Sequence, residues 1–120
     1  MLPEKKINQF KFNYPLGIHD FYQLFNKNFD INQFKSIPQF IYMGKLDDND
    51  AVQFDDAYSD IERNLINTNL GSDVQNRYLK CQEIYKKNNI NATFITYENV
   101  GHWTTSEMNL EVIKFFFNQM

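Results

Sequence analysis

The chain has 120 residues and a formal net charge of −3 at pH 7; 42% of the residues are hydrophobic and 17% are aromatic. This length fits one domain with a modest core, and the apolar content argues against disorder. The basic residues occur as scattered pairs and form no stripe that could neutralise a row of phosphates, so nucleic acid is not an expected partner. No apolar run reaches the roughly 18 residues that span a bilayer, so no membrane segment is expected.

Residues 1–36 form an N-terminal segment whose role the sequence leaves open. They lack the apolar stretch of a signal peptide, so the expected location is the cytoplasm if this N-terminus is authentic, and it is otherwise undefined. Aromatic residues alternate between positions 10 and 14, which predicts a short extended segment. Asp20 is a candidate N-cap for a short amphipathic helix, and His19 is expected to be an ordinary surface or core histidine.

Residues 37–120 form a C-terminal part in which strands and helices are expected to alternate. The apolar run 39–43 is β-prone and stops at Gly44, which predicts a buried strand. Apolar residues at four-residue intervals predict an inserted helix over 56–69, which stops near Gly71. The apolar positions of that helix are Ala57, Ile61 and Leu65.

A second long helix is predicted over 73–88, because Ser72 and Gln75 have the spacing of a capping box. Its apolar face consists of residues at helical spacing: Val74, Tyr78, Cys81 and Tyr85. Cys81 is the only cysteine, so it cannot form an internal disulfide and is expected to be a small buried residue. Residues 92–97 are strongly β-prone and predict the second strand.

The last helix is predicted from a second capping-box pattern, Thr104 to Glu107, and continues to the C-terminus. Its apolar stripe consists of Met108, Val112, Phe115 and Phe116. The order strand, helices, strand, helix predicts an α/β fold with about two parallel strands flanked by helices. Because ligands and catalytic groups gather beyond the carboxyl ends of such strands, the candidate loops are 44–50 and 98–103.

These two loops carry the motifs Gly44-x-x-Asp47 and Gly101-His102. Together with the order of elements over residues 37–120, they resemble the acid-to-histidine part of the α/β-hydrolase family. The resemblance implies a partial α/β-hydrolase sheet, an esterase-like activity on a small-molecule ester, and a catalytic triad with Asp47 as acid and His102 as base. In that chemistry the carboxylate orients the imidazole, and the two glycines would let the backbone turn sharply at the strand ends.

Other roles remain open for these residues. Asp47 belongs to an acidic turn that could be a solvated loop, His102 could simply bond a backbone group, and Asp50 is an alternative catalytic acid. The turn resembles a calcium loop only superficially, because, counted from Asp48, it lacks the glycine at the sixth position and the glutamate at the twelfth. No His and Cys cluster has zinc spacing, so neither a metal ion nor a cofactor is expected.

The nucleophile of a serine hydrolase is missing from the sequence. The family places it in Gly-x-Ser-x-Gly on a strained strand-to-helix turn, and no such motif occurs here. None of the serines has both flanking glycines: Ser36, Ser59, Ser72 and Ser106. We therefore expect an incomplete hydrolase that is inactive alone and contributes the acid and the histidine, with its serine on a segment upstream of this chain.

The strand at 39–43 would pair in a complete sheet with a strand that the chain does not obviously contain, which leaves an apolar edge open. The expected partners are therefore the missing upstream hydrolase segment or a second copy of the chain, giving an oligomer. The alternative function is a non-catalytic interaction module derived from a hydrolase scaffold. A small ligand-binding protein without catalytic ancestry is a third hypothesis.

Overall fold

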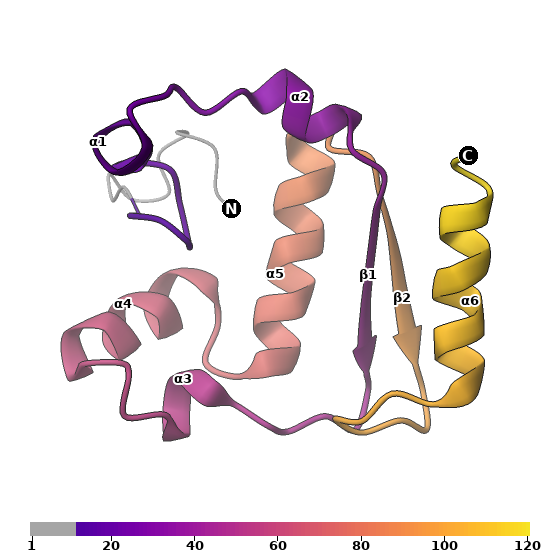
Figure 1. The fold of residues 1–120 in the computed structure, drawn as a ribbon. Coiled ribbons are helices and arrows are strands. Elements are labelled where there is room, and N and C mark those ends of the chain that lie inside the picture. Colours follow the sequence, from indigo (N-terminus) through magenta and orange to yellow (C-terminus); the bar gives the residue numbers. More distant parts are fainter. Residues whose placement is uncertain (1–11) are drawn as a thin grey trace.

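The computed structural model describes residues 12–120. Its elements, in chain order, are α1 (Phe21–Phe25), α2 (Ile31–Ser36), β1 (Gln39–Gly44), α3 (Ala51–Phe54), α4 (Asp60–Leu70), α5 (Val74–Lys87), β2 (Ala92–Tyr97) and α6 (Ser106–Phe117) (Figure 1). The predicted α/β class is confirmed at this level: helices flank a parallel sheet of two strands. None of the helices in residues 12–120 has both the length and the apolar character needed to cross a bilayer.

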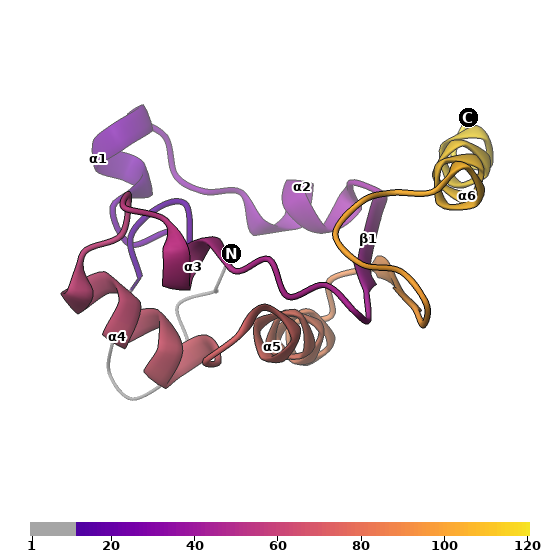
Figure 2. The same cartoon turned by 90° about the horizontal axis from the view of Figure 1, so that it is seen from below.

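The sheet has the predicted strands in the predicted direction. β1 and β2 run parallel, in register from Gln39 opposite Ala92 to Gly44 opposite Tyr97. α5 covers one face of this sheet and α6 covers the other, as Figures 1 and 2 show from two directions. The two strands therefore form the middle layer of three, and their carboxyl ends lie side by side at the same end of the sheet.

Aromatic side chains join the sheet to α5. The Phe94 ring of β2 lies 5.8 Å from the Tyr78 ring and 5.4 Å from the Tyr85 ring, measured between centroids. Both tyrosines are buried, and each hydroxyl donates to a group of the sheet, the Ile95 carbonyl oxygen or the Gln39 side-chain oxygen, at 3.0 Å. The predicted apolar face of this helix is thus confirmed at Tyr78 and Tyr85, whose hydroxyl groups are hydrogen-bonded, as buried tyrosine hydroxyls require. Cys81, which was expected to be buried, is only partly buried.

α6 packs on the opposite face of the sheet. Its Phe115 ring lies 5.3 Å from that of Phe40 on β1, and Met108 is among the most deeply buried side chains. The predicted stripe is wrong at Phe116, which is 53% exposed. Phe116 directly follows Phe115, and neighbouring residues on a helix point about 100° apart, so both cannot face one flat sheet.

Residues 12–36 form a chain of aromatic ring contacts that reaches α5 through Phe34. The edge-to-face pairs are Tyr14–Phe21, Tyr14–Phe25, Phe21–Phe29 and Phe34–Tyr85, and the Phe29–Phe34 pair is tilted. The extended segment predicted at 10–14 starts outside the described residues, and the chain turns at positions 14–16. α1 starts after Asp20 as predicted, but the Asp20 side chain accepts from the Tyr14 amide at 2.7 Å instead of capping the helix.

Several helix starts differ from the sequence predictions. Asp73 caps α5, and Thr105 caps α6, so both predicted capping boxes are wrong by one residue. The inserted helix starts later than predicted, where Ser59 and Glu62 form a reciprocal capping box. Its predicted face is also wrong at Ala57, which is exposed and lies before the helix, and at Ile61, which is 75% exposed. The buried residue of this helix is Ile66. α2 and α3 were not predicted, since helices of six and four residues are too short for apolar periodicity.

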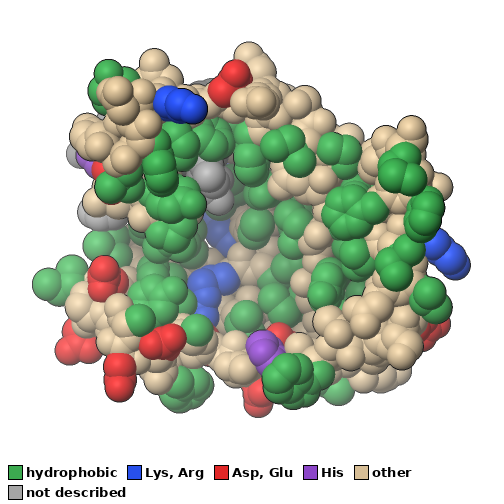
Figure 3. Space-filling model, in the orientation of Figure 1, with side chains coloured by type: hydrophobic (Ala, Val, Ile, Leu, Met, Phe, Trp, Pro, Cys, Tyr) green, Lys and Arg blue, Asp and Glu red, His purple; other side chains and the backbone are tan. Residues whose placement is uncertain are grey.

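Apolar surface remains open on the described part of the chain. Figure 3 shows hydrophobic side chains spread over the face seen in Figure 1, including the region of α1 and α6. Among the exposed ones are Tyr22, Leu24, Leu46, Phe54, Trp103, Leu110, Ile113 and Phe117. Within residues 12–120 the sheet contains only β1 and β2, so the outer edge of each strand lacks a strand partner. This is the open edge that the sequence predicts for the first strand.

Candidate functional site

Asp47 and His102 lie together beyond the carboxyl ends of the two strands. Nδ1 of His102 is 3.2 Å from Oδ2 of Asp47. The Asp47 side chain is 12% exposed and that of His102 is 48% exposed, so the carboxylate lies beneath the imidazole. The structure therefore brings together the two residues that the sequence selects, although they are 55 positions apart.

The loops that carry these residues are joined by backbone hydrogen bonds beyond the strand ends. The amide of Lys45 donates to the carbonyl oxygen of Tyr97, and the amide of Leu46 donates to that of Val100, both at 2.9 Å. These bonds continue the β1–β2 pairing into the loops. The distance between Asp47 and His102 is consequently set by the parallel register of the sheet.

Gly44 allows the two loops to approach closely. A Cβ atom placed on Gly44 would lie 2.2 Å from the carbonyl oxygen of Gly101 and 2.4 Å from that of Val100. A Cβ atom on Gly101 would meet nothing nearer than 4.0 Å. Neither glycine has a positive φ, so neither serves a left-handed backbone conformation. Gly44 is required because no side chain fits between the loops.

The Asp47 carboxylate is oriented by its own turn. Its Oδ1 accepts from the amide of Asn49 at 3.0 Å, and the Asp47 amide donates to the carbonyl oxygen of Gly44 at 3.1 Å. Oδ2 is thereby directed to His102. A carboxylate only accepts hydrogen bonds, so the neutral imidazole donates through Nδ1 and its Nε2 is left as an acceptor. This tautomer is the one that a general base needs.

Gln75, which the sequence pattern predicts for a capping box, belongs to this site. Its Nε2 donates to the carbonyl oxygens of Gly44 at 2.9 Å and Asp47 at 2.8 Å. Because Asp73 caps α5, the Gln75 side chain is not used in the predicted capping box. No local pattern marks such a contact, since it joins positions 28 and 31 residues apart.

Asp50 is not the acid that faces the imidazole. It is 5% exposed, pairs with the Arg77 guanidinium, and caps α3 by accepting from the Val52 amide at 3.1 Å. Arg77 also donates to the carbonyl oxygen of Gly71 at 2.9 Å. The other carboxylate oxygen of Asp50, Oδ2, is buried without a hydrogen-bond partner among residues 12–120. Asp50 therefore tethers the segment after β1 to α5, while Asp47 contacts His102.

No hydroxyl or thiol group is hydrogen-bonded to the imidazole within residues 12–120. The contacts of His102 there are the Asp47 carboxylate and the ring of Trp103, whose centroid lies 5.3 Å away. Ser59 and Thr105 cap helices, and burial raises the pKa of the Cys81 thiol on α5, which disfavours the thiolate. The hydroxyl that Nε2 would deprotonate is not among these groups.

The remaining sequence predictions concern residues that lie away from the carboxyl ends of β1 and β2. His19 is exposed in the N-terminal layer, and its backbone amide donates to the carbonyl oxygen of Phe12 at 3.1 Å. Across residues 12–120, no three His, Cys, Asp or Glu side chains are grouped so as to hold a metal ion. The acidic turn after β1 is instead occupied by the contacts of Asp47 and Asp50 described above.

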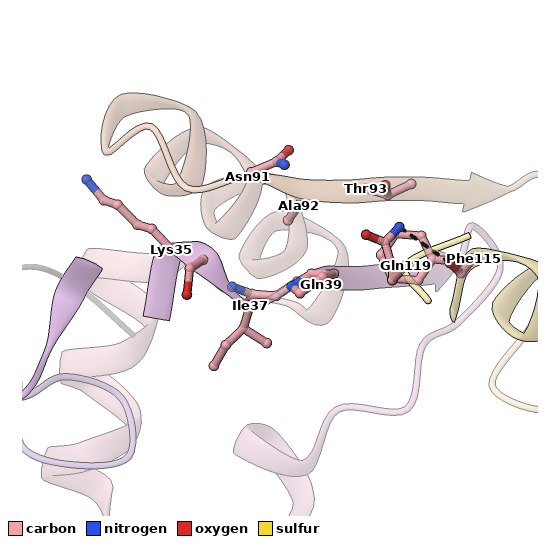
Figure 4. Close-up of a pocket in the computed structure, with 10 residues that line it drawn as sticks. Lys35, Ile37, Gln39, Asn91, Ala92, Thr93, Phe115 and Gln119 are labelled. Carbon is pink, nitrogen blue, oxygen red and sulfur yellow. Dashed lines mark hydrogen bonds between the residues drawn. The ribbon is translucent and has the colours of Figure 1, made fainter. Parts of the chain in front are cut away.

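A pocket of about 290 Å³ lies at the opposite, amino end of the strands. It is lined by the segment before β1, by the first residues of β2, by Phe115 of α6 and by Gln119 just after that helix (Figure 4). Gln119 is held there by a hydrogen bond from Nε2 to the carbonyl oxygen of Phe115 at 3.4 Å. In Figure 4 the Lys35 side chain extends away from the other lining residues. The pocket is separate from the Asp47–His102 pair, so it is not part of the candidate site.

Comparison of the chain with protein-family models, with curated proteins and with solved structures finds no match. The likeness to the α/β-hydrolase family therefore depends on this chain's own motifs, element order and geometry.

Proposed function

We propose that this chain supplies the acid and the histidine of an esterase-like serine hydrolase, and that a segment outside this chain supplies the serine. The observation that supports this proposal is the 3.2 Å contact between Asp47 Oδ2 and His102 Nδ1 at the carboxyl edge of a parallel sheet. At this edge of open α/β sheets, loops are free to carry reactive groups while the strands fix their positions.

The chemistry follows from the orientation of the imidazole. With its Nδ1 proton held by Asp47, His102 has Nε2 available to accept the proton of a serine hydroxyl as that hydroxyl attacks an ester carbonyl. The imidazolium that forms is stabilised by the carboxylate, and it returns the proton to the leaving alcohol. The half-exposed His102 side chain leaves room for a further group against its ring.

The test is reassembly of the enzyme. The coding sequence upstream of Met1 is first examined for an in-frame Gly-x-Ser-x-Gly, and an unrelated flank there counts against the proposal. The upstream segment is then co-expressed with this chain and assayed on a nitrophenyl ester. His102→Ala should lower kcat by about 10⁴-fold or more, whereas the matched control His19→Ala should leave it unchanged. Equal activity of the two variants would remove His102 from the mechanism.

A non-catalytic interaction module is the second candidate function. It is favoured by the open strand edges and the exposed apolar side chains of the described residues. A double variant, Asp47→Asn with His102→Ala, separates the two candidates. Partner binding that is unaffected by the double substitution, together with no ester hydrolysis on reassembly, would favour the module.

A further inference from the structure

Gln75 ties the turn that carries Asp47 to a helix of the core. It lies in the first turn of α5, and because Asp73 caps this helix, the Gln75 amide can reach the end of β1. Both amide hydrogens are used there, one on the carbonyl oxygen of Gly44 and one on that of Asp47. These carbonyls belong to the two ends of one four-residue turn, so a single side chain fixes both ends.

The helix that carries Gln75 is itself fixed to the sheet. Tyr78, three residues further along α5, is buried and donates to the carbonyl oxygen of Ile95 on β2. The two hydrogen bonds of Gln75 therefore set the position of the Asp47 backbone relative to β2, the strand that leads to His102. Gln75 links the acid to the histidine through the core, in addition to the loop contacts between Leu46 and Val100.

We propose that Gln75 is a positioning residue, which keeps Asp47 Oδ2 within reach of His102 Nδ1 by holding the Asp47 backbone. This inference rests on the proposed function, in which that contact sets the tautomer of the imidazole. The contact has little margin: it measures 3.2 Å, and a shift of about 1 Å would end it as a hydrogen bond. Loss of the two hydrogen bonds donated by Gln75 should therefore change the tautomer of the His102 imidazole, in addition to the stability of the fold.

The test compares Gln75→Glu with Gln82→Glu in the full chain. Both substitutions add the same charge to α5 and nearly preserve the side-chain shape, but Gln82 is exposed and only Gln75 donates to the turn. Gln75→Met and Gln82→Met form a second, uncharged pair in case the charge prevents folding. NMR then gives the ratio of Nδ1–H to Nε2–H tautomer of His102 at an alkaline pH, and the exchange rates of the Leu46 and Asn49 amides.

We expect Gln75→Glu to lower the tautomer ratio about tenfold, which corresponds to about 1.4 kcal/mol. The Leu46 and Asn49 amides should exchange about tenfold faster, and neither Gln82 variant should change either quantity. A Gln75 variant that folds with the wild-type tautomer ratio overturns the positioning role.

Asp47→Asn separates this failure from failure of the proposed function. If Asp47→Asn lowers the tautomer ratio and the Gln75 variants do not, the Asp47–His102 pair stands and the positioning role of Gln75 is refuted. If Asp47→Asn leaves the ratio unchanged while the Gln75 variants speed amide exchange, Gln75 holds the turn, but Asp47 does not govern His102. That second result refutes the catalytic pair and, with it, the positioning of Asp47 toward His102.

Discussion

Replacing Gly44 by alanine should separate the two loops that carry Asp47 and His102. The new Cβ would lie 2.2 Å from the Gly101 carbonyl oxygen, whereas ordinary van der Waals contact starts at 3.4 Å. The Val100–Gly101 backbone must therefore retreat by about 1 Å, since the obstacle is backbone and cannot rotate away. That movement would break the 2.9 Å bond between the Leu46 amide and Val100, and would also separate Asp47 from His102.

The expected cost follows from these two losses. Overpacking costs about 1–3 kcal/mol and a broken hydrogen bond costs about 1 kcal/mol, so we expect Gly44→Ala to lower the free energy of unfolding by about 2–4 kcal/mol. For a domain of this size each kcal/mol corresponds to a fall in Tm of about 4 °C.

Urea unfolding followed by circular dichroism measures how far Gly44→Ala lowers the free energy of unfolding. Gly101→Ala is the matched control, because its Cβ would meet nothing nearer than 4.0 Å and its φ is not in the left-handed region. Equal stability of the two variants would refute the claim that the loops are in close contact at Gly44.

Three further predictions concern the ion pair, a tyrosine and the open edge. Asp50→Ala leaves the Arg77 guanidinium without its carboxylate partner, so it should lower the free energy of unfolding by about 3–5 kcal/mol. Asp48→Ala, at an exposed neighbouring position, should cost little, and equal effects of the two substitutions in urea unfolding would contradict the ion-pair role of Asp50. Burial, reinforced by the hydrogen bond to Glu111, raises the pKa of Tyr97 to about 12 from 10.0. The protonated hydroxyl therefore stabilises the fold fully below pH 10, and this stabilisation is lost as the pH rises to 12. Ultraviolet titration should show one tyrosine that ionises late, and Glu111→Gln should lower the pKa of that tyrosine. If Tyr97 ionises near pH 10 in both proteins, burial and Glu111 do not raise its pKa. The open strand edge should make the chain self-associate, so size-exclusion chromatography should give an apparent mass above 14.4 kDa that falls on dilution, and a dilution-resistant monomer would count against it.

The parts of the fold that local patterns encode could be predicted from the sequence. The β-prone runs 39–43 and 92–97 both form strands, and the spacing of Tyr78 and Tyr85 identifies the buried face of α5. Parallel pairing could be predicted from the order of elements, and it places the carboxyl ends of both strands at the same end of the sheet. Asp47 and His102 could therefore be expected to lie together before any distance was known.

The polar contacts that hold the site could not be predicted, because they join residues distant in sequence. Gln75 fits a capping box in the sequence, and only the structure shows that its amide donates to the turn after β1. Asp50 was an alternative acid because nothing local indicates its pairing with Arg77. Ile61 was assigned to the wrong face because an apolar residue on a helix becomes buried only where another element covers it.

The most direct test of the central claim is to observe which nitrogen of each imidazole carries the proton, by ¹H–¹⁵N NMR at an alkaline pH, in the unmodified chain and in Asp47→Asn. We predict that His102 carries its proton on Nδ1, and that Asp47→Asn shifts it toward Nε2 while His19 is unchanged, because only His102 lies against a carboxylate at 3.2 Å. A His102 whose tautomer matches that of the exposed His19, and does not respond to Asp47→Asn, would contradict the pairing on which the proposed hydrolase chemistry depends.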